Sequence, residues 1–481
     1  MASGIEKTIR STVTKGIDAI SEFNRKRRSS LDKPHPFLTG IHVPMTTEET
    51  LADLVVDGEI PKQLDGRYLR IGPNPVTAPD PASYHWFIGD GMAHGIRILD
   101  GQAVWYRNRW VRSIAVSEAL GEALKPGIRN PRFDTANTNI IGVKGRTFAI
   151  VEAGGKPVEL SNELETISHN PFDGTLKHSF SAHPHLDVHT GEQHAICYDG
   201  ETVDKVWHVV LDPGAQVIRE EPITVSDGPS IHDCAITKNY VLIFDLPVTF
   251  SMKALLSGLL FPYAWNDKHK ARVGLLPRNG TNADVVWCDV EPNYVFHVAN
   301  AFETADDNVV VDVVSHDRMF ARSTLGPDSV RSRLERWTIN PSTRRVDRRV
   351  LHDHNQEFPR IDDRRTSMPY RYAYSIALPM EDHIELTIAA TVLFKHDVGN
   401  ASTEVRDFGK DRHPGEFVLV PRNESGAEDD GWLIGLVVDM SNETTALEIL
   451  NADDFTGPAQ AVIHVPHRIP PGFHGNWVAT A

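Results

Sequence analysis

Four histidines stand on four separate, strand-like stretches of the 481-residue chain. They are His183 in SFSAHPHLD, His232 in PSIHDCAIT, His297 in EPNYVFHVANAFE and His474 in PPGFHGNWV. A neutral imidazole is a good ligand for iron, zinc, copper or nickel. A metal held by four imidazoles and no carboxylate would keep its full positive charge, which would favour an electron-rich partner such as reduced oxygen. The spacing alone does not show that the four meet, because most of the 23 histidines are expected to be ordinary surface or hydrogen-bonded residues.

Histidines so far apart in the sequence can meet only in a closed fold with a common axis. The pattern of short strands in this chain is typical of such a fold. From about residue 60 the chain reads as short strands and turns, for example 67–72, 94–101 and 103–111, with a tight hairpin turn at Asp100-Gly101. One hairpin unit repeats loosely as HLDVHTGEQHAICYD, VVLDPGAQVIRE, WTINPSTRRVDRRVL and LNADDFTGPAQAVIHV. Such hairpins favour a β-propeller, whose inner strands line one axis. A sandwich or a two-domain β protein would share much of this pattern.

Two segments depart from the strand pattern. Residues 5–23 place apolar side chains at helical spacing and are followed by the basic cluster 25–28. Residues 250–265 are apolar and helix-like, with a single lysine. Each segment either packs on the main body or touches a membrane surface. We predict an N-terminal amphipathic helix and basic linker over 1–35, and one catalytic propeller domain over 36–481.

Composition limits the partners and the compartment. The net charge of −16 offers no basic field for nucleic acid. The odd number of separated cysteines (Cys197, Cys234 and Cys288) indicates a reducing, cytoplasmic setting. Residues 1–28 lack the apolar core of a signal peptide, and no apolar run is long enough to span a bilayer. We therefore expect a cytoplasmic protein with peripheral membrane contact through 5–28 and 250–265.

Eight motifs in a fixed order resemble one known family. They are LDGRYLRIGPNP, YHWFIGDGMAHG, TANTN, SAHPHLD, SIHD, EFPRID, EDDGWL and GFHGNW. From about residue 36 to its end, the chain resembles the carotenoid cleavage oxygenases, especially the bacterial ones. These non-haem iron enzymes include the retinal-pigment-epithelium isomerase and the stilbene cleavers. The resemblance implies an all-β, seven-bladed propeller with a helical cap over a substrate tunnel.

The resemblance also implies roles for individual residues. One Fe(II) on the propeller axis would be held by His183, His232, His297 and His474. Strand alternation cannot choose between His183 and His185, which point to the same side, but the family pattern selects His183. Glu152, Glu357 and Glu416 match carboxylates that accept the free ring N–H of every ligand histidine except the first. Thr138 matches a position beside the open iron coordination site. Phe296 matches an aromatic residue of the tunnel, although plain core packing would also account for it.

The activity implied by the resemblance is an oxidative cleavage. With O2 as co-substrate, a conjugated C=C bond of a lipophilic polyene, a carotenoid or apocarotenoid, is cut into two carbonyl products. Stilbene cleavage within the same family is the alternative, but the matching stretch 110–124 has no lysine to hold a phenol. Thr138 favours an oxygenase, because the retinoid isomerases replace this threonine.

Two alternatives lie outside this activity. His185 and Asp187 with His232 would suit the facial triad of a 2-oxoglutarate oxygenase, but the chain is too long and too rich in hairpins for a lone jelly roll. A non-catalytic propeller that binds carotenoid or acts as a scaffold would also share the fold.

Overall fold

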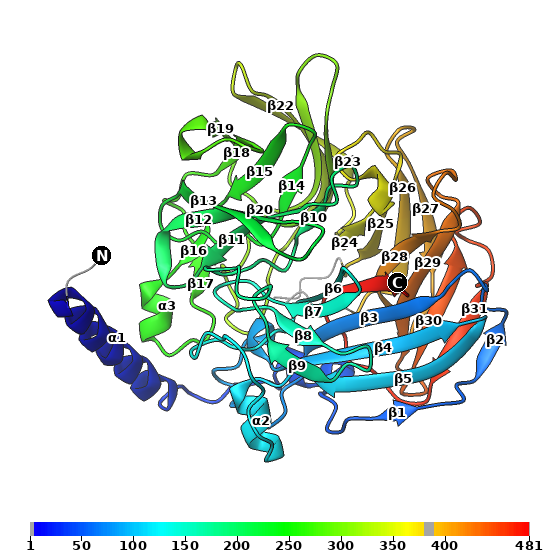
Figure 1. Cartoon of the computed structure of the whole chain (residues 1–481), viewed down its shortest axis with the longest axis horizontal. Helices are drawn as coiled ribbons and strands as arrows, with labels where there is room; N and C mark the ends of the chain where they lie inside the picture. Colours follow the sequence, from blue (N-terminus) through cyan, green and yellow to red (C-terminus); the bar gives the residue numbers. More distant parts are fainter. Residues whose placement is uncertain (1–3, 380–388, 481) are drawn as a thin grey trace.

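Seven β-sheets radiate around one centre in the computed structural model, which describes residues 4–379 and 389–480 (Figure 1). Of residues 4–13 only the backbone is described. Each sheet is a blade of four or five antiparallel strands. The innermost strands of most neighbouring blades contact one another around the centre. The fold is thus the predicted seven-bladed β-propeller.

The N-terminal part of the chain forms most of blades 1 to 4. In order across its sheet, blade 1 is β1 (Thr50–Leu51), β5 (Gln102–Trp110), β4 (Gly91–Leu99), β3 (Gly66–Pro73) and β32 (Gly475–Ala479). Blade 2 is β6 (Asn139–Val143), β7 (Arg146–Ile150), β8 (Val158–Leu160) and β9 (Thr166–His169). Blade 3 is β10 (His185–Leu186), β11 (Gln193–Asp199), β12 (Thr202–Leu211) and β13 (Val217–Thr224). Blade 4 is β14 (Cys234–Ile236), β15 (Tyr240–Asp245), β18 (Arg272–Pro277) and β19 (Val286–Asp289).

The remaining blades complete the circle. Blade 5 is β20 (Tyr294–Glu303), β21 (Val309–His316), β22 (Ser332–Asn340) and β23 (Arg345–His352). Blade 6 is β24 (Gln356–Arg360), β25 (Tyr372–Ala377), β26 (Val392–Asp397) and β27 (Ser402–Asp407). Blade 7 is β28 (Arg412–Pro421), β29 (Gly431–Asp439), β30 (Thr444–Asn451), β31 (Ala461–Val465) and β2 (Val56–Gly58). A small hairpin of β16 (Val248–Phe250) and β17 (Tyr263–Trp265) projects between β15 and β18.

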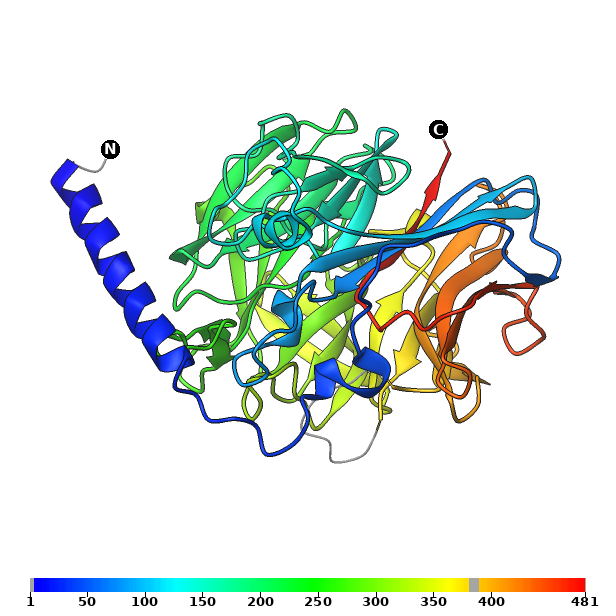
Figure 2. The ribbon, with the colours of Figure 1, turned by 90° about the horizontal axis from the view of Figure 1, so that it is seen from below.

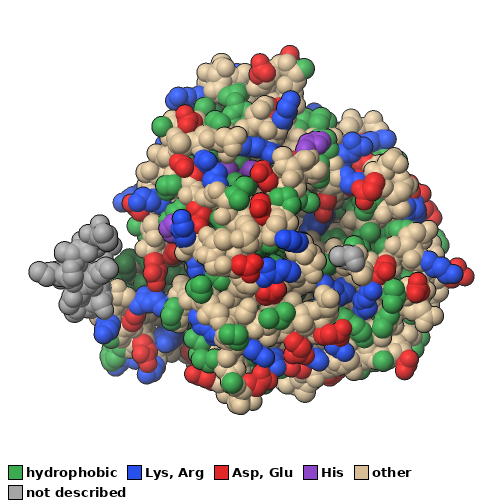
Figure 3. Space-filling view, in the orientation of Figure 1, with side chains coloured by type: hydrophobic (Ala, Val, Ile, Leu, Met, Phe, Trp, Pro, Cys, Tyr) green, Lys and Arg blue, Asp and Glu red, His purple; other side chains and the backbone are tan. Residues whose placement is uncertain are grey.

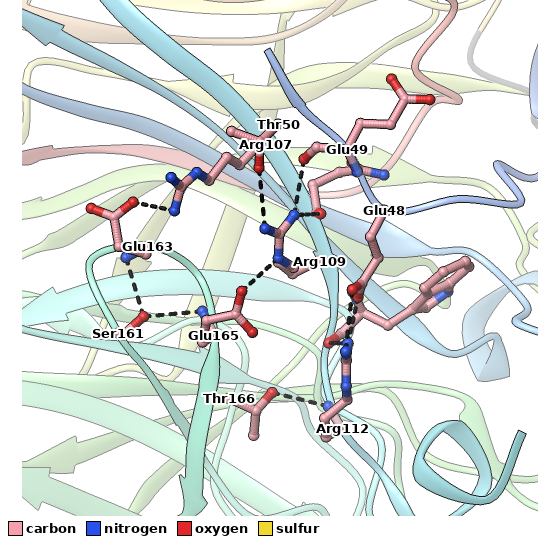
Figure 4. A network of polar contacts seen from close by, with 12 residues as sticks. Glu48, Glu49, Thr50, Arg107, Arg109, Arg112, Ser161, Glu163, Glu165 and Thr166 are labelled. Carbon is pink, nitrogen blue, oxygen red and sulfur yellow. Dashed lines mark hydrogen bonds and ion pairs between the residues drawn. The ribbon is translucent and has the colours of Figure 1, made fainter. Parts of the chain in front are cut away.

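Strands from the two ends of the chain close the ring. The C-terminal strand β32 pairs with β3, and the N-terminal strand β2 pairs with β31. Pairing in both places satisfies backbone groups that an open sheet edge would leave exposed. A polar network connects residues 48–50, near the start of blade 1, to arginines on and just after β5 and to residues 161–166 of blade 2 (Figure 4). Within it, Glu48 bonds Arg112, and the Arg109 guanidinium donates to the Glu165 carboxylate at 2.6 Å.

The middle strands of the blades are buried on both faces, so apolar and polar residues alternate less strictly in them than in a sheet with one face in water. All residues of β21 are buried, because a blade packs its two faces against its two neighbours. The one acidic residue there, Asp312, is fully buried and is compensated by Arg336 and by the hydroxyl of Tyr370. The predicted turn at Asp100-Gly101 joins β4 to β5, and both residues have positive φ, as a tight hairpin turn requires.

The helices lie outside the ring. Helix α1 (Gly4–Arg25) is the predicted amphipathic helix and projects beside the propeller, where it contacts α3 (Met252–Leu256) (Figures 1 and 2). Helix α2 (Ile114–Leu120) begins at the capping side chain of Ser113. The helix expected over 250–265 is shorter than the apolar pattern of that segment indicates, since α3 ends at Leu256. The chain turns at Gly258, which has a φ of 85°, and then forms β17.

None of the described helices combines the length and the apolar character needed to cross a bilayer. On the face shown in Figure 3, acidic and basic side chains are interspersed.

Candidate metal centre

The four predicted histidines meet at the centre of the propeller, each from a different blade. His183 precedes β10, His232 precedes β14, His297 lies on β20 and His474 precedes β32. A ligand nitrogen of each lies within 4.8 Å of the others. His232, His297 and His474 are buried, and His183 is partly exposed.

The spacing of the nitrogens fits a metal ion. The Nε2 atoms of His183 and His232 are 3.0 Å apart, and those of His297 and His474 are 3.1 Å apart. Imidazole–metal bonds are about 2.0–2.1 Å long, so two nitrogens that meet a metal at right angles are separated by about 3.0 Å. The donor set is therefore arranged as a metal would require, and it is the soft-to-intermediate nitrogen set that suits iron.

Three of the four rings are oriented by carboxylates from the remaining three blades. The Nδ1–H of His232 donates to Glu152 at 2.9 Å, that of His297 to Glu357 at 2.5 Å, and that of His474 to Glu416 at 3.0 Å. With the proton on Nδ1, the Nε2 lone pair is free to bind a metal. No described carboxylate lies within hydrogen-bond reach of the His183 ring. Each blade thus contributes one residue to a set of four histidines and three glutamates.

His185 is not part of this group. Its Nε2 lies 2.8 Å from Oδ1 of Asp233. Asp233 in turn accepts backbone N–H bonds from Cys234 and Val298. The facial triad of a 2-oxoglutarate oxygenase, with His185 and His232 as its histidines, therefore does not form.

Electrostatics keep Glu357 and Glu416 charged and His183 neutral. Burial lowers the pKa of His183 well below its usual value, and its three neighbouring imidazoles lower it further. Burial would raise the pKa of Glu357, but His297 and His316 outweigh it and hold the pKa well below its ordinary range. For Glu416 the same balance of burial against His474 and Arg360 brings the pKa to about 2. Buried negative charge thus lies behind the ligand histidines, which stabilises a bound cation.

Irregular backbone places these side chains on the inner strands. The pairing of β20 with β21 shifts register between Val295 and Val298, the step that contains His297, and again between Val298 and Asn300. Similar shifts occur between Glu357 and Arg360, and between residues 414 and 417 around Glu416. A bulge re-aims one side chain without breaking the strand. Phe358 lies inside the shift between Glu357 and Arg360, where its backbone takes a φ of 54° and its ring packs against His297. Local backbone strain is therefore held where the ligands converge.

Two cavities of opposite character meet at the histidines. The first, which we call the apolar cavity, has a volume of about 350 Å³ and reaches His232, His297 and His474. Its wall is mainly aromatic and aliphatic, and includes Trp86, Phe87, Phe133, Phe261, Phe296, Phe358 and Phe473. Its outer end has the exposed side chains of Asp18, Arg132 and Glu201, so it opens to the surface beside α1.

The second, which we call the polar cavity, has a volume of about 300 Å³ and reaches His183, His297 and His474. Asp233, Arg360, Asp363, Glu416 and Asn476 are in its wall. His232 borders only the apolar cavity and His183 only the polar one. The four imidazoles therefore form the partition between the two.

Thr138 and Phe296 both line the apolar cavity. The backbone carbonyl of Thr138 accepts from the N–H of His474, and its hydroxyl donates to Asn137. The Phe296 ring stands edge-on to His232 at a centroid distance of 5.2 Å. Both positions are therefore beside the ligand histidines, at the inner end of this cavity.

Sequence reasoning missed three residues that support the carboxylates. His316 shares Glu357 with His297, at 2.6 Å, and the Tyr198 hydroxyl donates to Glu152 at 3.0 Å. Arg360 lies 3.4 Å from Glu416. Only Arg360 had a signal in the sequence, since it stands three residues after Glu357 in the EFPRID motif.

Comparison with protein families gives one match that covers most of the chain. The model described as "Retinal pigment epithelial membrane protein" matches residues 42–479. A relative named "Carotenoid cleavage oxygenase" from Mycobacterium tuberculosis is 40% identical to this chain, and the alignment covers 93% of the chain and 98% of the relative.

Solved structures with the same fold include two oxygenases. Cobalt-substituted apocarotenoid oxygenase from Synechocystis is 27% identical, with a TM-score of 0.80 and coverage of 91% of this chain and 97% of that one. The lignostilbene dioxygenase of Pseudomonas brassicacearum is 25% identical, with a TM-score of 0.82 and coverage of 94% and 100%.

Proposed function

Since this chain belongs to the carotenoid cleavage oxygenase family, the family of the retinal pigment epithelial membrane protein model, we propose that it cleaves a conjugated C=C bond of a carotenoid or apocarotenoid. In this reaction O2 and one double bond give two carbonyl fragments, with one oxygen atom in each. The proposed metal is one Fe(II) per chain, held by His183, His232, His297 and His474. The observation that carries the proposal is an apolar cavity that opens directly onto three of these histidines.

The wall of the apolar cavity supports a polyene as the substrate. A conjugated hydrocarbon chain has no polar atoms to satisfy, and aromatic rings such as Phe296, Phe87 and Phe261 give it edge and face contacts. Among the described residues that line this cavity there is no lysine to hold a phenolate. This favours a carotenoid or apocarotenoid over a stilbene, although one structural neighbour is a lignostilbene dioxygenase.

The residues around the centre have distinct tasks in the proposed reaction. Fe(II) held by the imidazoles would supply the redox chemistry that lets O2 react with a double bond. Glu152, Glu357 and Glu416 fix the ring orientations and keep Nε2 unprotonated. Phe296 and Phe358 exclude water from the inner end of the cavity, and Thr138 limits the space beside His474. No side chain is needed as a general acid or base, because no proton is transferred overall.

We also propose that the protein works in the cytoplasm and rests on a membrane surface, which would give its cavity access to dissolved polyenes. Exposed apolar side chains gather on α1 and near α3, close to the outer end of the apolar cavity: Ile20, Phe23, Met252 and Leu260. The basic residues after α1 lie at the same edge, where they would suit anionic headgroups. All three cysteines are buried and unpaired, which supports a reducing compartment.

The cleavage proposal is tested by supplying substrates directly. Iron-loaded protein is incubated under ¹⁸O₂ with β-carotene, an apocarotenal and resveratrol, and the products are identified by mass spectrometry. We expect two labelled aldehydes from a polyene, whose masses give the bond that is cut. Aldehydes from resveratrol alone would establish the stilbene alternative. Unchanged substrates in the presence of one iron per chain would leave a carotenoid-binding role.

The membrane proposal has its own test. A chain carrying Ile20→Ser, Phe23→Ser and Met252→Ser, three exposed positions outside the cavity wall, is compared with the parent chain by sedimentation with anionic liposomes. We expect binding to fall severalfold while cleavage of detergent-dispersed substrate stays within about twofold. Equal sedimentation of the two proteins would refute the membrane contact.

A further inference from the structure

We propose that the metal reaches the four histidines through the polar cavity, and that the apolar cavity is reserved for the substrate. The inference rests on the metal centre of the proposed function, but it concerns a separate event, the loading of the protein. It assigns a role to two charged residues that have no task in the proposed cleavage, Asp233 and Asp363.

The wall of the polar cavity is suited to a hydrated divalent cation. Asp363, whose side chain is 68% exposed, stands at its outer end. Farther in are Asp233 with His185, and then Glu416 behind the ligand His474. Arg360 lies 3.4 Å from Glu416 and 3.8 Å from Asp363, and it donates to Asn476 at 3.0 Å. The three carboxylates of the wall, on Asp233, Asp363 and Glu416, outnumber Arg360 and His185. The net charge of the wall is therefore negative from the surface to the ligands.

One group along this wall could hold a cation briefly but is poorly arranged to keep it. Ligand atoms of His185, Asp233 and Cys234 lie within 4.8 Å of one another. Both Asp233 oxygens, however, already accept backbone N–H bonds, at 2.7 and 2.8 Å. A metal here would compete with those bonds, whereas the four imidazoles have free Nε2 atoms. This favours passage to the deeper site over retention.

The apolar cavity offers no comparable path. A divalent ion that loses its water among aromatic side chains is strongly destabilised, because no polar atoms replace the water. At its outer end, Arg132 lies 2.6 Å from Asp18 and 3.8 Å from Glu201. Asp18 and Glu201 are thus already paired, and Asp199 beside them accepts the backbone N–H of Glu201 at 2.8 Å. The other acidic residues of this wall, Glu152 and Glu357, lie at the centre itself.

His183 is the ligand best placed to receive the ion first. Of the two cavities it borders only the polar one, it is the most exposed of the four, and no carboxylate among the described residues fixes its ring. The other three rings are held in place by glutamates. A ring that no described carboxylate orients is the one that can adjust to the ion in the polar cavity and deliver it to three ligands that are already oriented.

Two leucines make a matched pair for testing the route. Leu186 borders the polar cavity and Leu260 the apolar cavity, and each is 41% exposed. The native cysteines are buried, at 0%, 1% and 0% exposed, so Leu186→Cys and Leu260→Cys can each be labelled selectively. The label is a bulky methanethiosulfonate reagent that a reductant removes. Circular dichroism and mass spectrometry confirm that both labelled proteins are folded and fully modified.

The measurement is the rate at which metal-free protein takes up Co²⁺, followed by its visible absorption in a stopped-flow instrument. We expect the label at 186 to slow uptake at least tenfold, the label at 260 to leave it within twofold, and reductant to restore the first. Slowing by the label at 260 alone, equal slowing by both, or no slowing by either would overturn the route. If unlabelled protein binds no Co²⁺ at equilibrium, the metal centre itself is refuted, and with it the proposed function.

Discussion

The two cavities that meet at the histidines have similar volumes, about 350 and 300 Å³, but walls of opposite polarity. The apolar cavity is walled by aromatic rings and has charged groups only at its mouth and at the centre. The polar cavity has carboxylates, an arginine and amides along its whole length. His297, His474 and Phe358 belong to both walls.

This difference teaches how one fold can separate two incompatible ligands. A hydrocarbon gains free energy from burial against apolar walls, at about 25 cal/mol per Å², whereas a cation is stabilised only where polar atoms replace its water. The ring of inner strands gives each ligand its own side of a thin partition. Changes on one side should therefore affect one ligand, and changes in the partition should affect both.

Removal of a residue from the partition gives the largest effect. His297→Ala takes away a ligand that borders both cavities, so bound metal should fall from one per chain to below about 0.1, and cleavage by at least about 100-fold. Metal content is measured by mass spectrometry and product formation by chromatography. His396→Gln, at a buried histidine bonded to Gln356 and Thr403 outside the centre, is the control. Full metal content in His297→Ala would contradict the assignment.

A carboxylate behind the partition should have the next largest effect. Glu357→Gln removes a charge that two histidines share, so metal affinity should fall by about 10- to 100-fold. Glu152→Gln should lie at the lower end of that range, because Glu152 serves a single histidine together with the Tyr198 hydroxyl. Both affinities are obtained from Co²⁺ titration against a competing chelator. An unchanged affinity in Glu357→Gln would show that ring orientation does not depend on this charge.

A change on the apolar side alone should spare the metal. Phe296→Leu removes aromatic contact area at the inner end of the apolar cavity, so kcat/KM for a polyene should fall by about 3- to 10-fold, with Co²⁺ affinity within twofold. Steady-state kinetics and the same titration measure the two effects. If the melting temperature falls while kcat/KM stays unchanged, Phe296 is a core residue and not part of the substrate site.

The smallest effect concerns acid stability of the metal-free protein. The pKa of Glu416 is lowered to about 2 in the folded state, so its contribution to stability is present above its unfolded pKa and is lost as the pH falls toward 2. Glu416→Gln should therefore be less stable than the parent at neutral pH, and its unfolding free energy should change less between pH 5 and about pH 2. Urea unfolding at several pH values measures this. Glu201→Gln, at an exposed carboxyl, is the control, and an equal pH dependence in parent and Glu416→Gln would contradict the prediction.

Much of the architecture could be predicted from local sequence. Hairpin turns such as Asp100-Gly101 depend on neighbouring residues, and their repetition along the chain favoured a propeller. A sandwich or a two-domain β protein shared much of that pattern, and the seven blades were implied by the family resemblance. The structure of the apolar segment 250–265 was harder to predict from its sequence. Its helix ends after about one turn near a glycine with positive φ, and part of the remainder pairs as a strand.

The site was less accessible to residue patterns. His183 and His185 are equivalent under strand alternation, and only the family resemblance separated them. The bulges that aim His297 and Glu416 inward are register shifts in the pairing of β20 with β21 and of β28 with β29, and no residue pattern in the sequence marks them. His316 supports Glu357 from another blade, a contact that no spacing in the sequence indicates. Such residues become recognisable only once the ring is closed.

The most direct test of the metal centre is diffraction from crystals of the iron-loaded protein, measured on both sides of the iron absorption edge. We predict one anomalous peak per chain, bonded to Nε2 of His183, His232, His297 and His474 and facing both cavities. A peak between His185, Asp233 and Cys234, or no peak at the four histidines, would contradict the account.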